Sequence, residues 1–78
     1  MENLEKYTIA FMQAFEVDKE TAVGLEYESI QEWDSVGHMV LMAELEAAFE
    51  ITMEMDDIID FSGFERGKEI LQNYGVIM

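Results

Sequence analysis

The sequence predicts a small all-α protein, and three observations support this. Three segments, residues 2–15, 35–50 and 62 to about 74, carry apolar residues at spacings of three and four, the period of an amphipathic helix. No segment has the pattern of a strand, and no proline interrupts the helices. The 78 residues, half of them hydrophobic, suffice for one core and a single domain, residues 1–78. We expect a helical bundle of three main helices and one short helix, with a long first loop.

The first helix is expected over residues 2–15, and it is followed by a long loop. Five residues share the inner face of this helix: Leu4, Tyr7, Thr8, Phe11 and Phe15. Residues 16–34 are less periodic, although a helical turn is expected to start at Asp18. Apolar residues spaced along the rest of the loop predict that it is ordered and packed on the core: Leu25, Tyr27, Ile30 and Trp33.

The longest helix is expected over residues 35–50, with Asp34 or Ser35 capping its start. Because each residue of a helix is rotated by about 100° from the one before, six residues of this segment fall on one face, which we expect to face the core. Its members are His38, Leu41, Met42, Leu45, Ala48 and Phe49. The opposite face is a second apolar strip, formed by Val36, Met39, Val40, Ala43 and Ala47. Either the helix is central and covered on both sides, or this strip docks a partner. We favour docking because the rest of the chain is too short to cover both faces.

The remaining elements are expected to be short. Residues 56–60 suggest one helical turn. Ser62 and Glu65 match a capping box at the start of the last helix, which should run to about Tyr74. Ile70, Leu71 and Tyr74 would form its inner face, and Gly75 is a suitable C-terminal stop.

The charge of the chain limits the classes of partner. Four Lys and Arg residues stand against 18 Asp and Glu residues, which gives a net charge of −14. This charge argues against nucleic acid and against an anionic membrane, because both require basic patches. It favours partners with basic docking surfaces, or bound cations. The sequence has no cysteine, no signal peptide and no apolar run long enough to span a membrane, so we expect a cytoplasmic monomer without membrane insertion.

A catalytic site is one interpretation of the residues around Ser35. Asp34, Ser35 and His38 are the residue types of a hydrolytic triad, but His38 falls on the predicted core face. No glycine-rich turn supplies an oxyanion hole, so we do not expect an enzyme. Helix capping alone accounts for Asp34 and Ser35.

Metal binding is the other chemistry to consider. A lone histidine without cysteine makes a poor zinc site. The carboxylates that cluster near residue 57 are expected to form a solvated face that attracts cations weakly, without a specific metal site. They are Glu54, Asp56, Asp57 and Asp60.

The sequence from Asp34 to Ile51 resembles the acyl carrier proteins. The motif Asp34-Ser35-Val36 matches their Asp-Ser-aliphatic motif at the start of the second helix, and Leu45-Glu46-Ala-Ala-Phe49-Glu-Ile51 resembles the end of that helix. Length, acidity and the order of expected helices extend the resemblance over nearly the whole chain.

The resemblance implies a fold, a cofactor and partners. The fold would be an up-down four-helix bundle with a long first loop. A separate phosphopantetheinyl transferase would attach 4′-phosphopantetheine from coenzyme A to Ser35, and the thiol of this arm would carry acyl groups as thioesters. Acyl-transferring and acyl-modifying enzymes would dock on the helix after Ser35. The implied partner-binding residues are Asp34, Val36, Met39, Val40, Ala43, Glu44, Glu46, Ala47, Asp56 and Asp57.

The pathway is open between fatty-acid synthesis, polyketide synthesis and another dedicated acyl-transfer pathway. Gly37 and His38 depart from the residues that fatty-acid carriers often have there, and so do Val40, Ala43 and Ala47. The alternative from another class is an unmodified acidic interaction module that docks through the apolar strip between residues 36 and 47.

Overall fold

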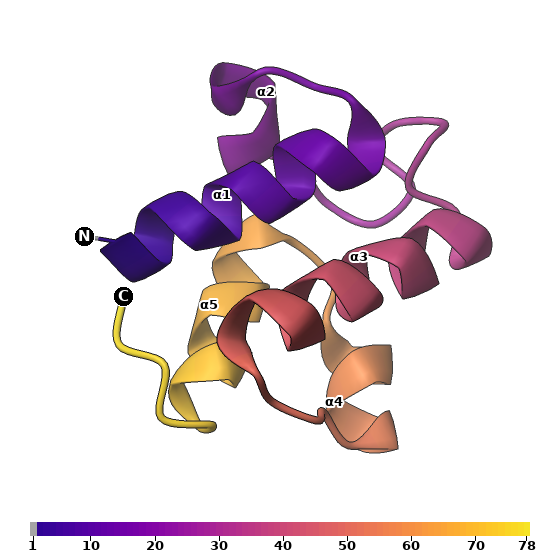
Figure 1. Ribbon diagram of the computed structural model, residues 1–78. Helices are drawn as coiled ribbons and strands as arrows, with labels where there is room; N and C mark the ends of the chain where they lie inside the picture. Colours follow the sequence, from indigo (N-terminus) through magenta and orange to yellow (C-terminus); the bar gives the residue numbers. More distant parts are fainter. Residues whose placement is uncertain (1) are drawn as a thin grey trace.

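The computed structural model describes residues 2–78 and confirms the all-α class (Figure 1). Residues 2–78 form no strand, only an isolated bridge between Glu26 and Gly63. The helices are α1 (Glu2–Phe15), α2 (Lys19–Val23), α3 (Ser35–Phe49), α4 (Met55–Asp60) and α5 (Phe64–Gln72). The first helix begins and ends as predicted, and α3 differs from the prediction by one residue. The expected turn at Asp18 is the short helix α2, so the structure has one short helix more than expected.

Helices α1 and α3 lie side by side over the core, and α5 closes it from behind (Figure 1). The short helix α2 packs against α1 and α5, and α4 follows the turn after α3. The two ends of the chain are adjacent, because the side-chain amide of Asn3 donates to the carbonyl oxygen of Ile77 at 3.0 Å.

The core is largely aromatic. Its large buried rings come from α1, the long loop, and the segment around the start of α5: Tyr7, Phe11, Phe15, Trp33, Phe61 and Phe64. The Tyr7 hydroxyl donates to the carbonyl oxygen of Phe64 at 2.6 Å, and burial raises the pKa of this hydroxyl far above its usual range. Gly67 makes this packing possible, because a Cβ there would overlap the Tyr7 hydroxyl and the Phe61 ring.

The loop before α3 is ordered, as predicted. Leu25 and Trp33 are buried in the core, and the loop is also bonded to the chain before α5. The amide of Tyr27 donates to the carbonyl of Ser62 at 2.9 Å, and the amide of Phe64 donates to the carbonyl of Leu25 at 2.9 Å. These bonds hold the middle of the loop against the start of α5.

The predicted capping box at Ser62 and Glu65 is wrong. Helix α5 begins at Phe64 with Gly63 as its N-cap, and no side chain caps it. The backbone of Ser62 and Gly63 is instead used to pair with the long loop, and the N-cap lies one residue further along the chain than predicted. Helix α5 ends at Gln72, and the turn that follows contains Gly75 at a φ of 86°.

None of the helices in the part of the chain that the structure describes has the length and apolar character that a bilayer-spanning helix requires.

Candidate functional site

Ser35 is the first residue of α3, and its side chain is exposed. The residue before it, Asp34, has an extended backbone, and its Oδ1 accepts a hydrogen bond from the amide of Gly37 at 2.8 Å. Of the two residues that could have capped the helix, Asp34 is therefore the cap. This leaves the Ser35 hydroxyl free of the capping role, at the start of a rigid helix.

Gly37 allows the long loop to pass close to the first turn of α3. A Cβ at this position would overlap the carbonyl oxygen of Glu32 and would lie 3.2 Å from the ring of Phe15. The glycine is thus needed for close approach of the backbone rather than for an unusual backbone conformation. The sequence marks Gly37 as unusual for a helix, but it does not show that the backbone of Glu32 approaches this residue, because no sequence pattern indicates such a contact.

His38 is half-buried, and both of its ring nitrogens are engaged. The indole Nε1 of Trp33 donates to Nδ1 at 2.9 Å, and Nε2 lies 2.7 Å from the carbonyl oxygen of Ile58 on α4. The core-face position predicted for His38 agrees with this placement. Neither nitrogen is left to accept a proton from Ser35, so the three residues of the triad-like motif do not form a charge-relay arrangement.

The apolar strip of α3 is exposed. Val36 is the most exposed of its larger side chains, at 72%, while Met39 and Val40 are about half exposed, at 54% and 46%. Ala43 and Ala47 are also exposed, and the buried stripe lies on the opposite side at Leu41, Met42 and Leu45. Within the described residues 2–78 the side chains of this face are exposed, so of the two interpretations the exposed strip holds.

Two further apolar side chains, which sequence reasoning missed, extend this kind of surface to α4. Met55 and Ile59 are four residues apart, and they are 70% and 74% exposed. Their spacing of four residues puts them on one face of the short helix, and the same spacing in the sequence could have predicted this apolar face.

Besides Asp34, the four other carboxylates predicted to bind partners have different environments. Glu46 is half-buried, and its Oε2 accepts a hydrogen bond from the amide of Met53 at 2.9 Å. Asp57 accepts a hydrogen bond from the Tyr74 hydroxyl, and this bond raises the pKa of Tyr74. Both side chains therefore hold the fold together around α4. Glu44 is half-buried without such a bond to the backbone, and Asp56 is exposed in the first turn of α4.

The side chains of residues 2–78 form no group of three or more His, Asp and Glu residues that could hold a metal ion. The acidic residues near α4 are thus separate charges, and not one coordination site.

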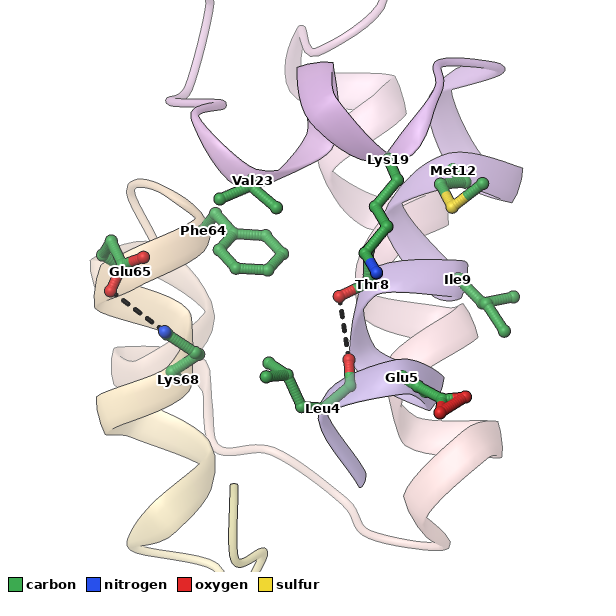
Figure 2. Close-up of a pocket in the computed structure, with 10 residues that line it drawn as sticks. All are labelled: Leu4, Glu5, Thr8, Ile9, Met12, Lys19, Val23, Phe64, Glu65 and Lys68. Atoms are coloured by element: carbon green, nitrogen blue, oxygen red, sulfur yellow. Dashed lines mark hydrogen bonds and ion pairs between the residues drawn. The ribbon is translucent and has the colours of Figure 1, made fainter. Parts of the chain in front are cut away.

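A surface groove of about 620 Å³ lies between α1, α2 and α5 (Figure 2). Its walls are mainly apolar, and the side chains of Lys19 and Lys68 reach it from opposite sides. Lys68 pairs with Glu65 at 3.1 Å across one turn of α5. None of the predicted site residues lines this groove, so it is separate from the surface around Ser35.

Comparison with protein-family models, with curated proteins and with solved structures finds no match.

Proposed function

We propose that the protein is an acyl carrier protein, which carries acyl groups as thioesters on a 4′-phosphopantetheine arm attached to Ser35. The observation that carries this proposal is the exposed serine at the first position of α3, directly after a capping aspartate, in the motif Asp34-Ser35-Val36. In this proposal α1, α3, α4 and α5 are the four helices of the carrier bundle, and α2 belongs to its long first loop.

The surroundings of Ser35 fit an acceptor that another enzyme modifies. The Ser35 oxygen would form the new bond to the β-phosphorus of coenzyme A, adenosine 3′,5′-bisphosphate would leave, and a base of the transferase would take the hydroxyl proton. The protein itself need not supply that base, which is consistent with the two engaged nitrogens of His38. The Asp34 cap occupies the amide of Gly37 and leaves those of Ser35 and Val36 at the positive end of the helix, where a phosphodiester is favoured.

The arm, when bound, supplies the thiol that forms the thioester. The chain has no cysteine of its own, so its residues provide only attachment, orientation and recognition. We accordingly assign the protein no catalytic activity.

Partner enzymes would dock next to Ser35 on the apolar strip of α3. Val36, Met39 and Val40 supply exposed apolar contacts, and the net charge of −14 accelerates encounters with basic surfaces. Asp34, Ala43, Glu44, Ala47 and Asp56 complete the proposed docking surface. Glu46 and Asp57 would contribute mainly by placing α4, since both are bonded within the fold. A carrier that must release each enzyme gains from long-range attraction without tight contacts.

The second candidate function is an unmodified acidic interaction module. The exposed strip favours it as well, because Val36, Met39 and Val40 offer the same apolar surface to a partner whether or not Ser35 is modified. Modification of Ser35 separates the two candidates.

The test is loading of the purified protein with coenzyme A, magnesium and a promiscuous phosphopantetheinyl transferase, followed by intact mass measurement. We expect the mass to rise by one phosphopantetheine, and no rise for Ser35→Ala. Ser62→Ala is the matched control, since Ser62 is also exposed but precedes α5, and it should load like the unchanged protein. An unchanged mass would leave the unmodified interaction module as the better assignment, and loading of Ser35→Ala would overturn the attachment to Ser35.

A further inference from the structure

A hydrogen-bond chain joins the long loop, α3 and α4 within one turn of Ser35. Trp33 Nε1 donates to His38 Nδ1, and His38 Nε2 is 2.7 Å from the carbonyl oxygen of Ile58. An indole N–H can only donate, so Nδ1 must be the accepting nitrogen of the imidazole. The proton of the neutral ring is then on Nε2, which donates a hydrogen bond to the carbonyl oxygen of Ile58. The chain holds His38 in one tautomer and satisfies every polar atom in it.

Aromatic rings enclose this hydrogen-bond chain. Trp33 is fully buried and stacks on Phe15 with the ring centroids 5.1 Å apart. The His38 ring is nearly parallel to that of Trp33, at an interplanar angle of 18°, and it meets the edges of Tyr27 and Phe61. The space beneath the first turn of α3 is therefore filled by rings that pack on one another.

The position of His38 decides what a group on Ser35 would meet. Three residues along a helix correspond to a rotation of about 300°, so the two side chains lie about 60° apart around α3. His38 and its bond to Ile58 therefore lie on the side of α3 next to Ser35, where an acyl chain that turned toward the core between α3 and α4 would have to pass.

We propose that the Trp33–His38–Ile58 chain closes the α3–α4 side of the core, so that the acyl group carried on Ser35 stays outside the protein. This inference rests on the proposed attachment of the arm to Ser35. Entry of a chain would leave the indole N–H and the Ile58 carbonyl without partners among apolar rings, which is unfavourable. An acyl group that remains in water is favoured only when it is short or polar. The protein would therefore carry short acyl, aminoacyl or hydroxyacyl groups and not long aliphatic ones.

The groove between α1, α2 and α5 is another place where an aliphatic chain could be sheltered (Figure 2). No residue of α3 or α4 lines it, so occupation of the groove and opening of the α3–α4 side give different signals. Ile9 and Val23 report on the groove, and Trp33 and His38 report on the closed side.

The experiment compares the protein loaded with acetyl-phosphopantetheine and with octanoyl-phosphopantetheine from the corresponding coenzyme A thioesters. The chain has one tryptophan and one histidine, so their side-chain NMR signals need no further assignment. We expect the same Trp33 indole N–H shift for both acyl groups, and unchanged methyl shifts of Ile9 and Val23. Hydroxylamine should cleave the two protein-bound thioesters with the same rate ratio as the two free pantetheine thioesters.

The experiment distinguishes failure of this inference from failure of the proposed function. An octanoyl-dependent shift of Trp33, Ile9 or Val23, or slower cleavage of the octanoyl thioester than the free compounds predict, overturns this inference and leaves the attachment to Ser35 standing. Absence of any mass increase overturns the proposed function, and the inference with it.

Variants test the closure directly. His38→Ala removes both bonds and should allow the octanoyl group to shift the Trp33 signal, whereas Met39→Ala, an exposed neighbour, should not. If His38→Ala fails to fold, Trp33→Phe removes only the indole donor and should open the same side. An octanoyl-loaded Trp33→Phe variant with the same His38 ring signals as its acetyl form would count against the closure.

Discussion

Replacement of Gly37 by alanine should destabilise the protein, although alanine is the better helix former. At an unobstructed helix position the change would stabilise by about 1 kcal/mol. Here the new Cβ would overlap the Glu32 carbonyl oxygen, and it would lie 3.2 Å from Phe15. A backbone atom cannot turn away as the end of a side chain can, so the cost belongs in the upper part of the ~1–3 kcal/mol range for overpacking. The net loss is then about 1–2 kcal/mol, or roughly 4–16 °C in Tm for a domain of this size.

Urea unfolding followed by the fluorescence of Trp33, the single and fully buried tryptophan, measures this loss. Gly24→Ala is the matched control, because Gly24 has a φ of −102° and nothing lies within 4 Å of its added Cβ. The control should be neutral or should stabilise by about 0.4–1 kcal/mol. If Gly37→Ala is as stable as the unchanged protein while the control behaves as expected, the loop does not pack on α3 in this way.

Three other changes have expected outcomes. Glu50 ends α3 in the left-handed region at a φ of 54°, so Glu50→Gly should stabilise by about 0.5–1 kcal/mol in thermal unfolding, whereas Glu44→Gly inside the same helix should destabilise by a similar amount. Hydrogen bonds from Thr21 lower the pKa of Asp18, so its stabilising effect is present above the unfolded pKa and lost as the pH falls through the lower folded value. The stability gap between the unchanged protein and Asp18→Ala should thus shrink in acid, and a gap that widens would contradict the capping role. Calcium or magnesium at low salt should raise the Tm by reducing repulsion among 18 carboxylates, and this rise should vanish in concentrated sodium chloride; no rise at low salt would contradict it.

The features that the sequence predicted are those that depend on local periodicity. Phe11 and Phe15 in α1, and Leu41 and Leu45 in α3, repeat at helical spacing and are buried as expected. The exposed strip beginning at Val36 followed from the same count, because a helix face can be read without knowing its neighbours.

The features that the sequence did not predict depend on contacts between distant segments. Ile58 is 20 residues from His38, and no local pattern indicates that its carbonyl accepts the imidazole proton. Ser62 matches a capping box locally, but its backbone carbonyl bonds to Tyr27 in the folded chain, and α5 starts later as a result. In the sequence, Glu46 and Asp57 look like any other acidic residue of the surface. In the structure, the side chain of each is hydrogen-bonded within the fold.

The bond between Asn3 and Ile77 has a practical consequence for any fusion or immobilisation of this protein. Both ends of the chain emerge at one side of the molecule, and α3 begins at the other side (Figure 1). A purification tag, a surface tether or a neighbouring domain joined at either end would therefore point away from Ser35. Either end can be anchored to a sensor chip while the serine and the apolar strip face the solution, which makes both orientations equivalent for measuring how partners bind.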